Sequence, residues 1–165
     1  MGKVRVLFLC TNNSARSQMA EGLLRHFYGE RYEVHSAGAT PTRVHHLAVK
    51  VLAEIGIDIS RQRSKGIDEY RGWDFDVVAT VCMNTPSLTC LFCSTSGSKG
   101  DRPGVIAETL HSVDFFIEHG FSDPSEAKED EEKLVAFRAV RDEIKEWVIN
   151  YFFYPSRIKM DSQIA

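Results

Sequence analysis

The strongest constraint on the fold is an apolar segment near the start of the chain that ends abruptly at a cysteine. Residues 4–10 read VRVLFLC, and this run of apolar and β-branched residues predicts a buried strand. A short polar stretch follows at residues 11–14, and apolar residues at helical spacing begin directly after it. The sequence therefore predicts a strand–loop–helix unit with Cys10 at the tip of the strand.

Such a unit can hold a reactive thiol inside an anion-binding loop. The backbone N–H groups of the loop can point inward, and the start of a helix adds a positive partial charge. These surroundings favour a thiolate, and Arg16 adds a planar charged fork that suits a tetrahedral oxyanion. Ser17 can donate a hydrogen bond to the thiolate, and Ser14 can cap the helix. We expect the whole loop to bind the oxyanion: Thr11, Asn12, Asn13, Ser14, Ala15, Arg16 and Ser17.

The spacing Cys-x5-Arg does not identify such a site by itself. An inert core cysteine followed by a solvated arginine has the same spacing, and a match of this kind arises easily by chance. The context favours a site, because the apolar run stops at Cys10 and the loop holds Asn12 and Asn13. Asparagine tolerates the left-handed backbone conformations that loops around anions often require.

The composition is that of one globular domain with an adequate core. The chain has 165 residues, of which 43% are hydrophobic and 26% are charged, and its net charge is −3. This slightly acidic balance argues against general nucleic-acid binding, and no apolar run is long enough to predict a membrane span. No secretory signal is recognisable, so we expect a cytoplasmic protein in which cysteines are usually reduced.

Strand patterns and helix patterns alternate along the rest of the chain. Strands are predicted at 32–37, 75–82 and 114–119, and helices at 15–28, 41–55, 105–110 and from Ser125 or Asp130 onward. The alternation predicts the α/β class, as a three-layer sandwich with a four-stranded parallel sheet. We expect a single domain over residues 1–154, with an extended loop at about 84–113 and a frayed tail over 155–165.

A second cysteine and an acidic residue are predicted at the same edge of this sheet. In open parallel sheets the ligand site lies at the carboxyl ends of the strands. Cys82 ends the third predicted strand, and Asp123, which precedes Pro124, follows the fourth. Cys10, Cys82 and Asp123 can therefore meet at one site. On local sequence alone, Asp123 fits a turn residue or a helix cap equally well.

These residues resemble a known family. The segment CTNNSARS at 10–17, followed by QMAEG, resembles the phosphate-loop region of thioredoxin-coupled arsenate reductases, which share the low-molecular-weight protein tyrosine phosphatase fold. Further matching segments are SAG at 36–38, GIDIS at 56–60, FDVV at 75–78 and GFSDP at 120–124. The resemblance extends into the last helix and thus covers most of the chain.

The resemblance implies a relay of thiols that reduces arsenate. Cys10 would attack arsenate, Arg16 and the loop amides would hold its oxygens, and Asp123 would protonate the leaving hydroxide. Cys82 would then attack the Cys10 sulfur and release arsenite, and Cys90 would attack the resulting disulfide. Thioredoxin, or glutaredoxin with glutathione, would reduce the final Cys82–Cys90 bridge. The family also implies a monomer that needs no cofactor.

The cysteine spacing and the loop depart from the family pattern. Seven residues separate Cys82 from Cys90, one more than is usual in the family. Cys93 is an additional thiol, so it is the alternative resolving cysteine. The family usually has glycine at the position of Asn12, which must then adopt the backbone angles of that glycine.

A potassium site of the family also differs in this chain. Many relatives bind potassium through positions that match Asn13, Glu21 and Ser36, together with an acidic residue. Lys65 stands at the acidic position here, and an ammonium group can replace a monovalent cation. We therefore expect Lys65 to pair directly with Glu21, and we predict that no metal is required.

Two other functions compete with this hypothesis. A low-molecular-weight phosphatase acting on phosphotyrosine or a small phosphorylated substrate uses the same nucleophile, arginine and acid. It needs no further thiols, however, and such enzymes usually carry an aromatic residue after Asp-Pro, where this chain has Ser125. A zinc site on Cys82, Cys90 and Cys93 lacks a fourth ligand at suitable spacing. His45 and His46 lie near a predicted helix start, where solvated histidines are expected.

Overall fold

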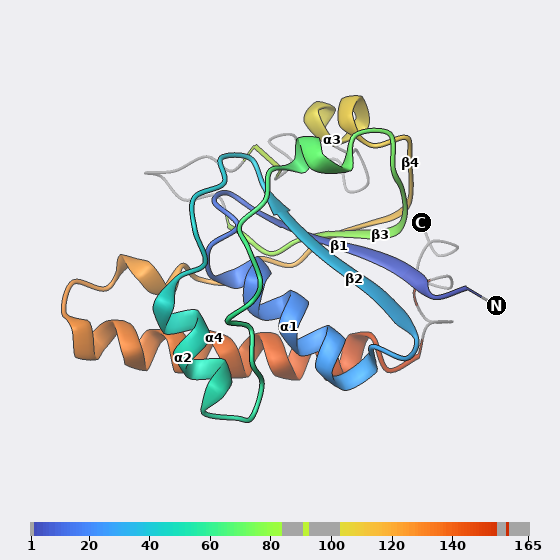
Figure 1. Cartoon of the computed structure of the whole chain (residues 1–165). Coiled ribbons are helices and arrows are strands. Elements are labelled where there is room, and N and C mark those ends of the chain that lie inside the picture. Colours follow the sequence, from blue (N-terminus) through green and yellow to red (C-terminus); the bar gives the residue numbers. More distant parts are fainter. Residues whose placement is uncertain (1, 84–90, 93–102, 155–157, 159–165) are drawn as a thin grey trace.

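Four parallel strands form one sheet in the order β2-β1-β3-β4 (Figure 1). The computed structural model describes residues 2–83, 91–92, 103–154 and 158. The strands are β1 at Val4–Cys10, β2 at Tyr32–Gly38, β3 at Asp74–Thr80 and β4 at Ser112–Glu118. The predicted α/β class and four-stranded parallel sheet are therefore confirmed.

The central position of β1 explains its continuous apolar sequence. This strand pairs with β2 along its whole length, from Val4 opposite Tyr32 to Cys10 opposite Gly38. Its other edge pairs with β3, and all residues from 6 to 10 are buried. A strand with neighbours on both edges and helices over the sheet has no solvent-facing side, so polar residues do not alternate with apolar ones.

Helices cover both faces of the sheet, which gives the three predicted layers (Figure 1). Three of them, α1 at Arg16–Tyr28, α2 at His46–Ala53 and α4 at Asp130–Tyr151, lie together on one side. The short helix α3 at Gly104–Thr109 and the 3-10 helix η1 at Ile67–Tyr70 lie on the other. A second 3-10 helix, η2 at Pro124–Glu126, precedes α4.

Several predicted element boundaries differ from the structure, and two of the differences affect the site. Helix α2 begins at His46 and not at residue 41, because the preceding segment runs beside the loop that follows β1. Thr42 donates its backbone N–H to the Asn12 carbonyl at 3.2 Å, and His45 donates to the Ser14 carbonyl at 2.9 Å. Strand β3 ends at Thr80, so Cys82 lies two residues beyond it.

The core is formed by the apolar strands and by one stripe of the long last helix. Phe137, Val140, Ile144 and Val148 of α4 are buried against the rest of the fold. The predicted loop at 84–113 and the predicted tail at 155–165 lie largely outside the described residues, although Ile158 is described and is buried. Within the part of the chain that the structure describes, no helix is both long and apolar enough to span a membrane.

Candidate active site

The predicted nucleophile occupies the last position of the central strand. Cys10 is 3% exposed, and its Sγ lies 2.7 Å from Ser17 Oγ of helix α1. Gly38 of β2 lies opposite Cys10, and a Cβ there would come within 2.7 Å of the Asn13 backbone nitrogen. Glycine at this position therefore allows the loop after β1 to pass close to the neighbouring strand.

Asn13, which is fully buried, holds the loop after β1 in shape through its side-chain hydrogen bonds. Its amide donates to Ser17 Oγ and to Ser36 Oγ, both at 2.9 Å. Its oxygen accepts from the Lys65 backbone N–H and from the Gln18 amide, both at 2.8 Å. Asn13 is the left-handed residue of the loop, with φ of 48°. Of the two loop asparagines expected to tolerate a left-handed backbone, Asn13 adopts it and Asn12 does not.

Helix α1 starts beside the thiol without a side-chain cap. Ala15 is the N-cap residue, and its methyl side chain cannot make a capping hydrogen bond. The prediction that Ser14 caps this helix is therefore wrong. The Ser14 carbonyl accepts the backbone N–H of His45, which ties the loop to the start of α2. The uncapped N–H groups leave the positive end of the helix open to an anion near Cys10.

Arg16 and Asp123 are brought together, although more than a hundred residues separate them. Arg16 donates from Nη2 to Asp123 Oδ2 at 3.3 Å and from Nη1 to the Phe121 carbonyl at 3.0 Å. The other carboxylate oxygen, Oδ1, accepts from the backbone N–H and the hydroxyl of Ser125, at 3.0 and 2.7 Å. These contacts fix the Asp123 carboxylate at the carboxyl end of the sheet.

These groups line one small pocket. Its volume is about 60 Å³, which holds a few water molecules or one small oxyanion. The lining residues are Cys10, Thr11, Asn12, Ser14, Ala15, Arg16, His45, Asp123 and Ser125. Of the predicted oxyanion-binding residues, Asn13 and Ser17 do not line it, because both are buried beneath it.

His45 is the pocket residue that sequence reasoning missed. It was expected to be solvated, but it is half-buried, and its ring contacts Phe137 of α4. Burial, and to a lesser extent the charges of His46 and Lys133, lower the pKa of His45 against the opposing effect of Asp123. The only hint in the sequence that His45 belongs to the site is its position directly before an apolar helical pattern. Nothing nearby in the sequence shows that this helix start meets the loop after β1.

Cys82 lies at the same edge of the sheet but outside the pocket lining. The chain passes from β3 alongside the end of β1, where Val81 donates its N–H to the Leu9 carbonyl at 2.9 Å. Cys82 follows, is 3% exposed, and takes part in a disulfide. Cys90 and Cys93, the two predicted resolving cysteines, lie outside the described residues.

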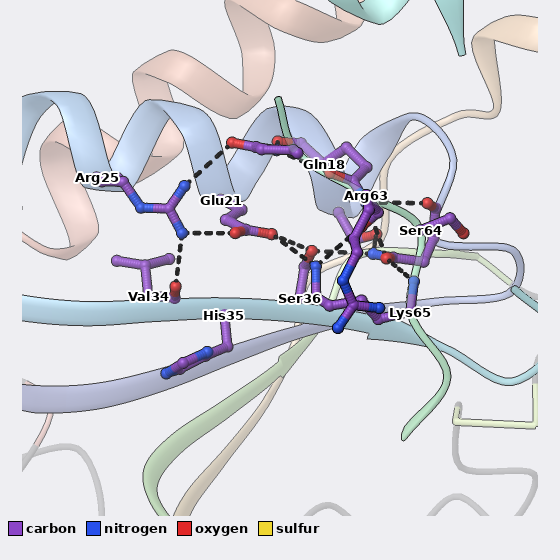
Figure 2. Close-up of polar contacts among 12 residues, drawn as sticks. Gln18, Glu21, Arg25, Val34, His35, Ser36, Arg63, Ser64 and Lys65 are labelled. Atoms are coloured by element: carbon purple, nitrogen blue, oxygen red, sulfur yellow. Dashed lines mark hydrogen bonds and ion pairs between the residues drawn. The ribbon is translucent and has the colours of Figure 1, made fainter. Parts of the chain in front are cut away.

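Figure 2 shows an ionic cluster between α1, β2 and the segment that carries Lys65. Lys65 Nζ lies 3.5 Å from Glu21 Oε2, which confirms the predicted pairing. Ser36 donates to the same carboxylate oxygen, and Arg25 binds Oε1 at 2.5 Å. Burial lowers the pKa of Lys65, whereas the Glu21 carboxylate raises it. Since Ser36 also accepts from Asn13, the cluster is linked by hydrogen bonds to the loop around Cys10.

Comparison with known proteins agrees with this geometry. Residues 5–164 match the family model of the low molecular weight phosphotyrosine protein phosphatase, so the chain belongs to that family. Its relatives include an arsenate reductase from Halalkalibacterium halodurans, 40% identical over 87% of this chain and 91% of the relative. A glutaredoxin arsenate reductase from Synechocystis is 33% identical over 88% of this chain and 94% of the relative.

The solved structures that resemble the chain include arsenate reductases as well. One of them, described as an arsenate reductase in the phosphate binding state, superimposes with a TM-score of 0.68 and 32% identity. The match covers 94% of this chain and 98% of that structure. The resemblance to arsenate reductases with the phosphatase fold is therefore confirmed.

Proposed function

We propose that this protein reduces arsenate to arsenite, with Cys10 as the nucleophile. The observation that carries the proposal is the pocket in which a buried strand-end thiol, Arg16 and Asp123 face the open start of helix α1. The arsenate reductases among its relatives support the choice of oxyanion. Arg16 and the loop N–H groups bind the oxyanion, because their positive charge faces the place where its oxygens lie.

The first step forms a bond between Cys10 Sγ and arsenic. The Cys10 thiolate attacks the arsenic of arsenate, and a hydroxide leaves with a proton from Asp123 as water. Ser17 supports the thiolate through its hydroxyl, 2.7 Å from the sulfur. Arg16 Nη2 lies 3.3 Å from Asp123 Oδ2, so the acid stands next to the group that binds the oxyanion.

The second step transfers an electron pair to arsenic. The Cys82 thiolate attacks Cys10 Sγ, the sulfur–arsenic bond breaks, and its electrons stay on arsenic, which leaves as arsenite. Cys90 then attacks Cys82 Sγ, releases the Cys10 thiolate and forms a Cys82–Cys90 disulfide. The burial of Cys82 at the edge that holds Cys10 supports its role, and Cys93 is the alternative to Cys90.

The external reductant is a dithiol protein. We propose thioredoxin, because a relay that ends in an intramolecular disulfide presents the bond that thioredoxin reduces. The name of the Synechocystis relative makes glutaredoxin with glutathione the alternative. Either donor requires a reducing compartment, so we propose that the protein acts in the cytoplasm. We also propose that it is a monomer, as the family resemblance implies.

The test compares Cys82→Ser with Cys10→Ser in two assays. With thioredoxin, thioredoxin reductase and NADPH, both variants lose multiple-turnover arsenate reduction. Hydrolysis of p-nitrophenyl phosphate survives in Cys82→Ser and is lost in Cys10→Ser, because only Cys10 attacks the phosphoryl group. Unchanged arsenate turnover in Cys82→Ser removes the relay and favours a phosphatase.

Trapped disulfides identify the resolving thiol. Mass spectrometry after a single arsenate turnover is expected to find Cys82 bonded to Cys90. A bond to Cys93 transfers the resolving role to that residue. Absence of any intramolecular disulfide rules out the thioredoxin mechanism.

A further inference from the structure

His45 lines the pocket together with Cys10 and Asp123, but none of the steps above uses it. It is the N-cap residue of α2, and its side chain accepts a hydrogen bond from the backbone of that helix. Its protonation, orientation and free hydrogen-bonding capacity show what else it can do.

The cap hydrogen bond fixes the tautomer of the neutral ring. Leu47 donates its backbone N–H to His45 Nδ1 at 3.2 Å, so Nδ1 carries a lone pair. A neutral imidazole with an unprotonated Nδ1 carries its hydrogen on Nε2. The pKa of His45, lowered by burial, agrees with a neutral ring. Nε2 makes no hydrogen bond to any residue in the described ranges, so its donor is available.

The orientation of the ring is also fixed. The ring of His46 stacks on it at 4.8 Å and 19°, and the Phe137 ring lies 4.6 Å away at 33°. The backbone N–H of His45 donates to the Ser14 carbonyl, which ties the backbone that carries the ring to the loop around Cys10. A donor held in this way loses little conformational freedom when it binds a ligand.

We propose that the Nε2–H group of His45 donates a hydrogen bond to an oxygen of the tetrahedral oxyanion bound at Cys10. This makes His45 a substrate-binding residue, and its identification with arsenate rests on the function proposed above. A neutral donor suits this position, because a second cation beside Arg16 would attract the Asp123 carboxylate and oppose its role as an acid. Arg16 provides the positive charge that attracts the oxyanion, and His45 provides an oriented, uncharged hydrogen-bond donor.

Two substitutions separate this contact from the cap. His45→Asn keeps an acceptor at the position of Nδ1, and asparagine is among the best N-cap residues, but its side chain is too short to reproduce Nε2. His45→Gln places an amide N–H near the position of Nε2 and caps poorly. A role in binding and a role in structure therefore predict opposite results for the same pair of variants.

Binding is measured with inorganic phosphate, as protection of Cys10 from alkylation by iodoacetamide. For His45→Asn we expect a thermal midpoint close to that of the wild type and a phosphate dissociation constant about tenfold higher. For His45→Gln we expect a lower midpoint and a dissociation constant nearer the wild-type value. His111→Asn is the control, because His111 is exposed and pairs with Asp74 at the opposite edge of the sheet.

Wild-type phosphate affinity in His45→Asn overturns the proposal, even if His45→Gln fails to fold. Weakening that follows only the loss of thermal stability overturns it too, as does a wild-type protein that binds no phosphate. The KM for arsenate is measured in parallel. If phosphate binding depends on His45 but the protein does not turn over arsenate, the proposed hydrogen bond is supported. The proposed function is then contradicted.

Discussion

At the scale of single residues, the site depends on side chains buried beneath the thiol. Ser17 Oγ accepts a hydrogen bond from the Asn13 amide at 2.9 Å, so its own hydrogen is free to point at Cys10 Sγ, 2.7 Å away. Asn13 is oriented in turn by the Lys65 backbone and by Gln18. When Cys10 is a thiolate it carries no hydrogen, so Ser17 Oγ is the donor in this contact.

Removing this hydrogen bond should make Cys10 less reactive. In Ser17→Ala the thiolate loses a donor, so we expect alkylation of Cys10 by iodoacetamide at neutral pH to slow by about tenfold. Ser60→Ala, an exposed serine whose side chain lies away from the pocket, is the control and should react at the wild-type rate. An equal rate in Ser17→Ala contradicts the assigned direction of the hydrogen bond.

The ammonium group of Lys65 should make activity independent of potassium. It lies beside Glu21 in the place where relatives were expected to hold that ion, so replacing NaCl by KCl should leave wild-type arsenate reduction unchanged. Lys65→Asp supplies a carboxylate to the same cluster, and its turnover and thermal midpoint should rise with potassium. Lys65→Met, which adds no oxygen ligand, should show no such response. Potassium-specific stimulation of the wild type contradicts this prediction.

At the scale of elements, helix α4 is joined to α2 by one carboxylate. Glu54, just after α2, contacts Arg138 at 2.8 Å and Arg141 at 2.9 Å. Arg141 also donates to the Val51 carbonyl at 2.9 Å. Hydrogen bonds from Arg138 are the main cause of the lowered pKa of Glu54. These contacts hold α2, and with it His45, against the long helix.

The lowered pKa of Glu54 fixes how this link depends on pH. Its contribution to stability is present above the unfolded pKa, near 4.3, and is lost as the pH falls through the lower folded pKa. Glu54→Gln should therefore melt at a lower temperature than the wild type at about pH 7, and the difference should shrink and disappear as the pH falls through the lowered folded pKa. Calorimetry across this range checks it, and a difference that persists in acid contradicts the ionic link.

The elements also show how far sequence reasoning reaches. Strand β1 was predictable because burial on both sides leaves a continuous apolar run, and the edge rule for parallel sheets correctly brought Cys10 together with Asp123. The start of α2 was not predictable, because residues 41–45 are kept out of the helix by hydrogen bonds from Thr42 and His45 to a loop some thirty residues earlier. His45 was missed for the same reason.

At the scale of the whole molecule, chemistry and stability occupy different regions. The pocket lies at the carboxyl ends of the strands, whereas a cluster of aromatic rings joins the end of α4 to the sheet. Phe152 is fully buried there, with ring centroids of Tyr32 and Trp147 each 5.5 Å away and Phe8 at 5.8 Å. The Tyr32 hydroxyl adds a hydrogen bond to the Phe152 carbonyl at 2.9 Å.

This separation predicts that the aromatic cluster can be weakened without changing the site. Phe152→Ala should lower the free energy of unfolding by about 3–5 kcal/mol, because it leaves a cavity among the rings of Phe8, Tyr32, Trp147 and Tyr151. Phe153→Ala is the matched control: its side chain is 46% exposed, and the loss should be about 1 kcal/mol or less. Urea titration followed by tryptophan fluorescence measures both.

In the absence of urea, the folded fraction of each variant should keep wild-type alkylation of Cys10, since no residue of the aromatic cluster lines the pocket. Slower alkylation in folded Phe152→Ala contradicts the separation and indicates that the end of α4 is coupled to the loop around Cys10.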